Sequence, residues 1–447
     1  MKVQYIFIYF ICLTINLTAL YSNDIAARVD EYVDSYVTQD RFSGSILIAK
    51  DGEVLLSKGY GYANREHGIP NSPEMKFRLG SVTKQFTTMV IMQLHENGEL
   101  SIQDPITEFL PDYPQDDEIT IHHLMSHTAG IPNFTSFPDY RETMMNPATL
   151  EEIIERFKDK PLEFEPGSKQ SYSNSGYILL GYIIEKVTGK PYADVVRERI
   201  FDIAGMDNSG YDDSRQIIKN RASGYEVNGS EVRNASHIDM SIPHAAGALY
   251  STVEDLYKWD RVLYTDKLLG NELLEKMFTP VRDNYAYGWI AGEMFDRRVL
   301  SHGGGINGFQ TNIVRFIEDD ICIIVLSNII PAPVSEITRD LAAIVLGEPY
   351  ELPKERLATE LPGEILERYV GQYELAPDFI LTVTREGDQL FTQATGQQRV
   401  EIYPATETEF FLTVVEAEIH FDVDEDGSVD GLILHQGGRK MPANKIK

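Results

Sequence analysis

Hydrophobic and polar positions follow two different periods along the chain, and the changes of period divide it into regions. Near the start, residues 24–38 carry apolar side chains at helical spacing, which predicts an amphipathic helix. Two apolar runs then flank the dipeptide Asp51-Gly52, and this pattern predicts a hairpin with strands over residues 43–50 and 53–62. The mostly apolar run over residues 85–94 favours a helix.

The middle of the chain favours helices, and the part after it returns to strands. Helices are expected at the start of residues 121–132 and over 149–157, 174–188, 192–201, 252–264 and 271–277, whereas residues 205–245 are polar and irregular. Strands are expected over residues 286–290, 299–303, 310–316 and 321–327, followed by a helix over 335–346. Strands at both ends with helices between them predict an α/β, two-lobed body. It would consist of an antiparallel sheet flanked by helices and an all-α lobe, with a cleft between the lobes.

Shifts in composition suggest where the domains end. Residues 1–23 have a single charge followed by an apolar stretch with small and polar residues after it, which predicts a signal peptide; a retained membrane anchor is the alternative. The main domain then covers residues 24–347. Prolines among charged residues indicate a linker over 348–363. Short alternating runs over residues 364–447 predict a small antiparallel β-barrel.

The charge balance narrows the possible partners. With 40 basic against 69 acidic residues the net charge is −29, so the chain lacks the basic surface of a nucleic-acid-binding protein. Its signal segment predicts export to the periplasm or the extracellular space, with membrane contact only through that segment. The two cysteines are Cys12, inside the signal, and Cys322, in a buried-strand pattern, so no intrachain disulfide is expected in the mature protein. The oligomeric state stays open.

Candidate chemistry starts at Ser81-Val82-Thr83-Lys84, where a loop becomes the expected helix. A serine there lies beside the free N–H groups of the helix start, where negative charge is favoured. Lys84 follows by three residues and lies on the same helix face, near enough to take the serine's proton. Alone, the pair fits an N-cap serine followed by a surface lysine better than a catalytic pair.

Two further segments carry chemistry. Tyr172-Ser173-Asn174 opens a buried helix and can present two polar side chains into a cleft. The run from Leu300 to Gly305 ends a strand with a histidine and three glycines, which usually mark the close approach of another backbone or a ligand. The candidate catalytic residues are Ser81, Lys84 and Tyr172, and the candidate substrate-binding residues are Asn174, His302, Gly303, Gly304 and Gly305.

The ordered set Ser-x-x-Lys, Tyr-x-Asn and His-Gly-Gly resembles the serine β-lactamase and penicillin-binding-protein superfamily, closest to its class C β-lactamase and DD-peptidase-like branch. Supporting stretches occur at residues 124–131, 246–252 and 287–289. The resemblance covers residues 25–346, and the C-terminal part resembles the small barrel appended to some relatives. It implies that Ser81 forms an acyl-enzyme, Lys84 is the base and Tyr172 relays the proton. It also implies that Asn174 holds the acyl-side amide, and that the N–H groups of Ser81 and Gly305 form the oxyanion hole.

Residue 302 is the main departure from the resembled pattern, since many relatives carry lysine there. A histidine has less positive charge at neutral pH and suits the carboxylate of a β-lactam poorly. The expected substrate is therefore a small D-amino-acid peptide or a short-chain ester, and a lactam is the third possibility. The alternative functions are a β-lactamase and a non-catalytic sensor of cell-wall fragments.

Other chemistries lack their motifs. The sequence has no Gly-x-Ser-x-Gly elbow, no His-Glu-x-x-His pair, no phosphate-binding loop and no dinucleotide fingerprint. The acidic run at residues 422–427 imitates the start of a calcium loop, but its twelfth position is Ile433. We therefore expect no cofactor and no metal.

Overall fold

The computed structural model describes residues 24–447 except 115–117, 229–230, 354–357, 378, 398, 413–416, 425 and 437–438. The predicted signal peptide lies outside the described residues. None of the helices in the described part has the length and the apolar character needed to cross a membrane.

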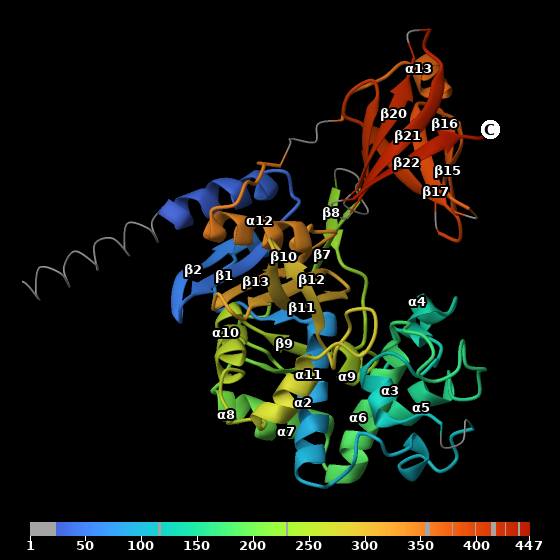
Figure 1. Cartoon of the computed structure of the whole chain (residues 1–447). Coiled ribbons are helices and arrows are strands. Elements are labelled where there is room, and N and C mark those ends of the chain that lie inside the picture. Colours follow the sequence, from blue (N-terminus) through green and yellow to red (C-terminus); the bar gives the residue numbers. More distant parts are fainter. Residues whose placement is uncertain are drawn as a thin grey trace, which may run out of the picture.

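The main body is built on a six-stranded antiparallel sheet with the order β10-β11-β12-β13-β1-β2 (Figure 1). Its strands are β1 (Gly44–Lys50), β2 (Glu53–Tyr60), β10 (Ile290–Met294), β11 (Arg297–Ile306), β12 (Phe309–Phe316) and β13 (Ile321–Ser327). The pairing of β1 with β13 joins the two ends of the region, as the sequence predicted.

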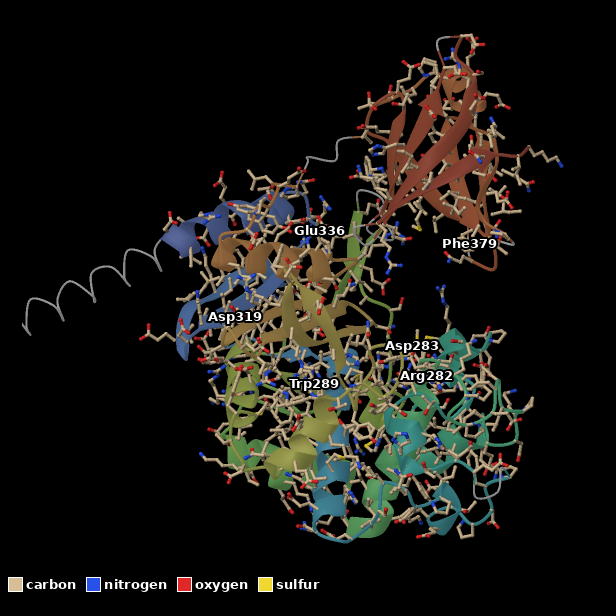
Figure 2. All side chains as sticks on the ribbon, viewed as in Figure 1. Arg282, Asp283, Trp289, Asp319, Glu336 and Phe379 are labelled. Carbon is tan, nitrogen blue, oxygen red and sulfur yellow. The ribbon has the colours of Figure 1, made fainter. Side chains whose placement is uncertain are left out.

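Both faces of the sheet are buried, which explains why its central strands are almost wholly apolar. Ile46 and Ile48 of β1 belong to one core, together with the helix over residues 24–37 and α12 (Val334–Leu346). Tyr36 of the first helix donates to Glu336 of α12 over 2.9 Å, which ties these helices together. Glu336 is labelled in Figure 2. Leu47 and Ala49 face the opposite core.

This second core lies between the sheet and the helices that hold the site. The helices are α2 (Thr83–Glu96), α3 (Ile121–Met125), α4 (Tyr140–Thr143), α5 (Leu150–Glu155), α6 (Asn174–Thr188), α7 (Tyr192–Val196), α8 (Asp202–Ala204), α9 (His244–Gly247), α10 (Val253–Val262) and α11 (Asn271–Phe278). A π-helical turn, Arg197–Phe201, connects α7 to α8. Trp289 fills part of this core, edge to face with Phe278 of α11 (Figure 2).

The helical regions agree with the sequence-based expectation, but two other predictions were wrong. The expected strand over residues 286–290 is a turn, with Gly288 at φ +72°, and β10 begins only at Ile290. Tyr287 and Trp289 are apolar because they are buried in a loop, not because they pair in the sheet. Residues 205–245 include short strands rather than only irregular chain: β6 (Gly210–Tyr211), β7 (Tyr225–Asn228) and β8 (Glu231–Asn234).

These short strands join small accessory sheets. The strand β5 (Phe77–Arg78) pairs with β9 (Leu249–Ser251), which also pairs with β6. The other small sheets use β3 (Tyr62–Asn64), β4 (Ile69–Pro70) and β14 (Ile329–Ile330). The β5–β9 pair matters for function because β5 leads directly into Ser81.

The C-terminal part is a closed eight-stranded barrel with a core of its own, preceded by α13 (Gly363–Arg368). Its strands are β15 (Gly371–Ala376), β16 (Phe379–Glu386), β17 (Gln389–Ala394), β18 (Val400–Pro404), β19 (Glu409–Leu412), β20 (Ala417–Val423), β21 (Val429–Gln436) and β22 (Arg439–Lys445). The predicted fold class, an α/β body with a small all-β barrel, is confirmed.

Candidate active site

Ser81 lies in a tight helical turn, Gly80–Val82, that leads into α2. Neighbouring segments hold Leu79, just before it, from two sides. Its N–H donates to the Leu249 carbonyl over 2.8 Å, and its own carbonyl accepts from the Thr311 hydroxyl over 2.8 Å. Gly80 has φ +53°, a left-handed conformation that glycine adopts without strain. The serine is thereby fixed where the turn meets the helix.

Lys84 lies one turn further along α2, and its side chain is completely buried. Its amine nitrogen Nζ is 2.8 Å from Asn174 Oδ1, 2.9 Å from the Ala246 carbonyl and 3.2 Å from Ser81 Oγ. Burial lowers the pKa of Lys84 well below its usual value, which favours the neutral amine. A neutral amine has two protons for the two acceptor oxygens, which leaves its lone pair for the Ser81 hydroxyl. The contacts of Lys84 are those of a general base for Ser81.

Tyr172 stands at the rim of the site, with 38% of its surface exposed, while its hydroxyl hydrogen-bonds Ser81. Withdrawal of the phenol from water raises the pKa of Tyr172, and the hydrogen bond to Ser81 opposes this only in part. The hydroxyl therefore carries its proton at neutral pH. The Lys84 amine lies 4.8 Å from the centre of the Tyr172 ring. A protonated phenol between a nucleophile and a base can pass a proton onward.

Asn174 begins α6, and two residues that the sequence analysis did not single out hold it. Its backbone N–H donates to Asn133 Oδ1 over 3.1 Å, and its side-chain Nδ2 donates to Thr135 Oγ1 over 3.1 Å. Its Oδ1 accepts from Lys84, so the orientation of the amide is defined. The second proton on Nδ2 is the group available to a substrate carbonyl.

The glycines of β11 differ in what surrounds them. A Cβ at Gly304 would lie 2.0 Å from the Leu79 carbonyl oxygen, so this position must be glycine for the strand to pack against the nucleophile segment. At Gly303 and Gly305 a Cβ would meet no such obstacle. Gly305 is exposed, yet its N–H lies against Gly80. Ser81 and Gly305, the two predicted oxyanion-hole donors, therefore belong to adjacent segments.

His302 turns its ring into the protein, where it is only 3% exposed. Its Nδ1 donates to the Gly303 carbonyl over 2.6 Å, because a carbonyl can only accept. Its Nε2 then accepts from the Tyr285 hydroxyl over 3.1 Å. Burial, with help from nearby Lys84, lowers the pKa of His302 to about 4. The residue is neutral at neutral pH and brings no positive charge to a bound substrate; direct contact with substrate stays a prediction.

An aromatic cluster surrounds Tyr172, and the sequence analysis did not assign it to the site. The His127 ring lies 4.2 Å from the Tyr172 ring, 4.6 Å from Tyr285 and 5.1 Å from Tyr177, measured between ring centres. His127 belongs to the stretch 124–131 that supported the resemblance, which was the one available signal. Tyr285 and Tyr177 are contributed by a loop and by the interior of α6, so only folding brings them here.

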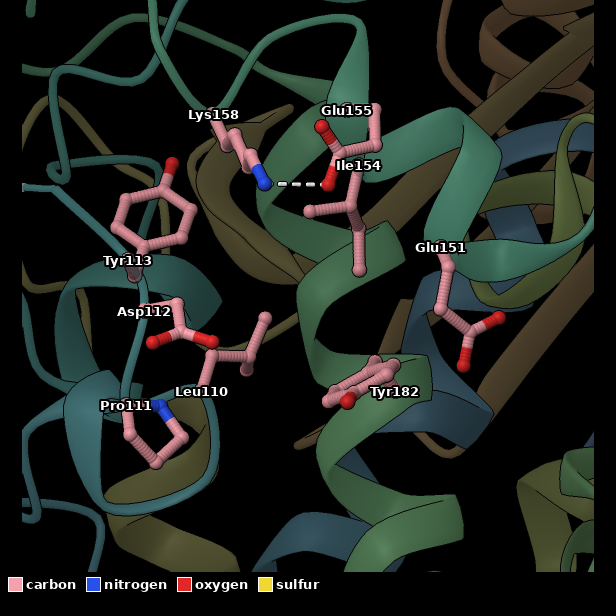
Figure 3. A pocket seen from close by; sticks show the side chains of 9 residues that line it. All are labelled: Leu110, Pro111, Asp112, Tyr113, Glu151, Ile154, Glu155, Lys158 and Tyr182. Atoms are coloured by element: carbon pink, nitrogen blue, oxygen red, sulfur yellow. Dashed lines mark hydrogen bonds and ion pairs between the residues drawn. The ribbon is translucent and has the colours of Figure 1, made fainter.

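A separate pocket of about 160 Å³ lies in the helical lobe (Figure 3). Its lining includes Tyr113, Tyr182 and the ion pair of Lys158 with Glu155. None of the eight predicted site residues lines it. In the described part of the chain, no three His, Cys, Asp or Glu side chains come together in a way that could hold a metal ion.

A serine whose neighbours are a desolvated lysine, a protonated tyrosine and an asparagine, set between an antiparallel sheet and a helical lobe, defines a β-lactamase-related serine hydrolase. The comparisons with known proteins agree. The family model described as Beta-lactamase matches residues 25–347, so the chain belongs to the beta-lactamase family. A second model, described as a domain of unknown function (DUF3471), matches residues 355–444.

Individual relatives are similar to the chain over much of its length. A penicillin-binding protein of Bacillus subtilis is 31% identical over 433 residues, which cover 91% of this chain and 96% of that protein. The teichoic acid D-alanine hydrolase of Staphylococcus aureus is 29% identical over 270 residues, covering 59% of this chain and 66% of the relative. The structure of a D-amino acid amidase from Ochrobactrum anthropi, complexed with L-phenylalanine amide, superposes with a TM-score of 0.64 at 26% identity and covers 72% of this chain and 99% of its own.

Proposed function

We propose that this protein is an exported serine hydrolase that cleaves D-aminoacyl amides and esters, including short peptides and short-chain esters, through an acyl-enzyme on Ser81. The observation that carries the proposal is the coordination of Lys84. Two carbonyl-type oxygens accept hydrogen bonds from its buried amine, and Ser81 Oγ faces the remaining lone pair at 3.2 Å. This arrangement activates a serine hydroxyl at neutral pH.

The proton balance follows from these contacts. Lys84 takes the proton of Ser81 as the serine oxygen attacks the substrate carbonyl carbon. The N–H groups of Ser81 and Gly305 stabilise the oxygen anion that forms, and losing one such donor costs about 3–4 kcal/mol in serine hydrolases. Tyr172 gives its proton to the leaving amine or alcohol and receives one from the Lys84 ammonium. Water then attacks the acyl carbon and gives a proton through Tyr172 to Lys84. Lys84 returns a proton to Ser81 Oγ as the acid is released.

The neutral state of His302 supports the choice of substrate. With its ring nitrogens occupied by Gly303 and Tyr285, it supplies no cation for a carboxylate on the leaving side. Amides, esters and longer peptides, whose leaving group carries no carboxylate next to the scissile bond, are therefore favoured over β-lactams and over peptides that end at the leaving residue. Two similar proteins, a D-amino acid amidase and a teichoic acid D-alanine hydrolase, are both named for D-amino acid substrates and point the same way.

Intact-mass spectrometry after brief exposure to three probes tests the proposal. The probes are a short p-nitrophenyl ester, a D-alanyl ester and a cephalosporin. We expect the two esters to add an acyl group faster than the cephalosporin, and Ser81→Ala to abolish every adduct. Ser168→Ala, an exposed serine outside the site, is the control and should behave as wild type. Adducts that persist in Ser81→Ala would refute the assignment of the nucleophile.

The sensor alternative predicts a different result. A protein that binds a D-alanyl probe but forms no adduct and releases no product with any of the three probes would be a binding protein and not an enzyme.

Export is tested separately: the N-terminus of the protein recovered outside the cytoplasm should lie near residue 24 if the signal segment is removed.

A further inference from the structure

His127 accepts hydrogen bonds from the backbone on both sides of Tyr172. The Ser171 N–H donates to the His127 carbonyl over 2.9 Å, and the Ser173 N–H donates to His127 Nδ1 over 3.2 Å. One residue thus accepts from both neighbours of the tyrosine, once with its main chain and once with its side chain. It does so in a left-handed conformation, φ +58°, which is uncommon for residues other than glycine, although histidine, asparagine and aspartate adopt it more often than most.

The His127 ring also covers one side of the tyrosine. Its centre lies 4.2 Å from the centre of the Tyr172 ring, at an interplanar angle of 40°. Behind it lie Tyr285 and Tyr177, so the imidazole is packed between Tyr172 and a second aromatic layer. Tyr285 and His302 also lie near Tyr172, with ring centres 6.2 Å and 6.4 Å away. The His127 ring is closer than either, and His127 alone among these residues also accepts hydrogen bonds from the backbone on both sides of the tyrosine.

The protonation state of His127 is also defined. Since Nδ1 accepts a hydrogen bond, the ring proton of the neutral form is on Nε2. Burial lowers the pKa of His127 well below its usual value, and nearby Lys84 and His302 add to this. Nε2 is buried without a hydrogen-bond partner among the described residues. A buried N–H without a partner is unfavourable, and a phenylalanine would avoid that cost but could not accept a hydrogen bond from Ser173.

From these contacts we propose that His127 is a positioning residue for the proton relay: it fixes the Tyr172 hydroxyl beside Ser81 for transfer to the leaving group. The inference rests on the proposed function and assigns a role to a residue that acts through Tyr172 and makes no hydrogen bond to Ser81. Displacing a catalytic group by about 1 Å can cost about 100-fold in rate. The two hydrogen bonds and the ring contact of His127, together called the His127 clamp, should therefore have a measurable effect.

Two variants separate the two contributions of the His127 side chain to the clamp, its hydrogen-bond acceptor and its ring. His127→Asn tolerates the left-handed conformation and places Oδ1 near the position of Nδ1, so it keeps the acceptor and loses the ring. His127→Phe keeps the ring and loses the acceptor, in a conformation that strains it. His123→Asn is the matched control, because His123 is a nearby histidine whose Nδ1 serves the cap of α3.

The experiment compares acylation by two substrates with the same D-alanyl group in single-turnover intact-mass measurements. The anilide needs a proton on its leaving nitrogen, whereas p-nitrophenolate leaves the ester as an anion. We expect acylation by the anilide to fall about 100-fold in His127→Phe and by a smaller factor in His127→Asn. Acylation by the ester should stay within about threefold of wild type, because it does not need the relay.

Equal losses for both substrates, or no loss for either, would overturn the proposal. Thermal unfolding of each variant is measured alongside, and if His127→Phe fails to fold, the ratio of the two rates in His127→Asn decides. Failure of the proposed function looks different: wild type itself would form no acyl-enzyme with either substrate. His123→Asn should keep the wild-type ratio of rates.

Discussion

Burial keeps the basic side chains of the site uncharged. Lys84, His127 and His302 are each at most 3% exposed, and burial is the largest cause of the lowered pKa in all three. For Lys84 this is useful, because only the neutral amine can take the proton of Ser81. For His302 it explains why the residue supplies hydrogen bonds and not charge. The chemical role of each side chain thus depends on its surroundings more than on its type.

The burial of His302 predicts a pH-dependent stability. Its pKa is about 4 in the folded protein against an ordinary value of 6.5. Between these values the unfolded chain binds more protons, so its contribution is fully present above pH 6.5 and is lost as the pH falls towards 4. From pH 7 to pH 5, His302 alone should lower the free energy of unfolding by about 2 kcal/mol.

Urea unfolding at the two pH values measures this effect. His302→Gln keeps an acceptor for Tyr285 and does not titrate, so its loss of stability on acidification should be smaller than that of wild type. His237→Gln, at an exposed histidine, should lose as much as wild type. If His302→Gln lost as much stability on acidification as wild type, the result would contradict the buried neutral state of His302.

At the scale of elements, the site depends on how closely β11 approaches the turn before α2. Gly304 permits the approach, and Gly80 lets the turn bend against Gly305. The glycine run could be interpreted from the sequence as a place of close contact, but the sequence did not show which glycine makes it. The wrong strand over residues 286–290 has a similar origin, since apolar content alone does not distinguish a buried loop from a strand.

The close approach predicts a difference between two glycine variants of the same sheet. Gly304→Ala should destabilise the protein by about 1–3 kcal/mol and reduce ester hydrolysis, because β11 must move away from Leu79. Gly292→Ala in β10 meets nothing within 4 Å and should leave both unchanged. Thermal unfolding and p-nitrophenyl ester hydrolysis are the measurements. Wild-type stability and rate in Gly304→Ala would show that the contact is not needed.

At the scale of the whole molecule, the barrel and the main body have separate cores. The core of the barrel contains residues from 361 to 443, and neither core of the main body includes any of them. Tyr350, inside the predicted linker, packs against Tyr32 of the first helix with ring centres 5.9 Å apart. The chain therefore still contributes to the main body at residue 350.

This separation predicts that the main body folds without the barrel. A chain of residues 24–353 should unfold cooperatively and form the same acyl-enzyme with the p-nitrophenyl ester at a similar rate. A chain ending at residue 347 lacks Tyr350 and should unfold at a lower temperature. Circular dichroism and intact-mass measurements decide, and loss of folding or acylation in the longer chain would show that the barrel supports the site.

The local patterns of the sequence were enough to predict much of this protein. Periodicity, turn residues and prolines predicted the hairpin, most helices and the C-terminal barrel, because these features depend on neighbouring residues. The order of strands and helices along the chain predicted that its two ends share one sheet. Short motifs identified Ser81, Lys84, Tyr172 and Asn174, since each lies at or near the start of a helix. The resemblance of their order to a known superfamily then grouped them in one site. The contacts and burial of the site residues depend on residues far away in the chain, so only the tertiary structure could show them. The coordination of Lys84 by Ala246, the inward turn of His302 and the clamp of His127 on Tyr172 all depend on burial and on contacts between segments far apart in the chain.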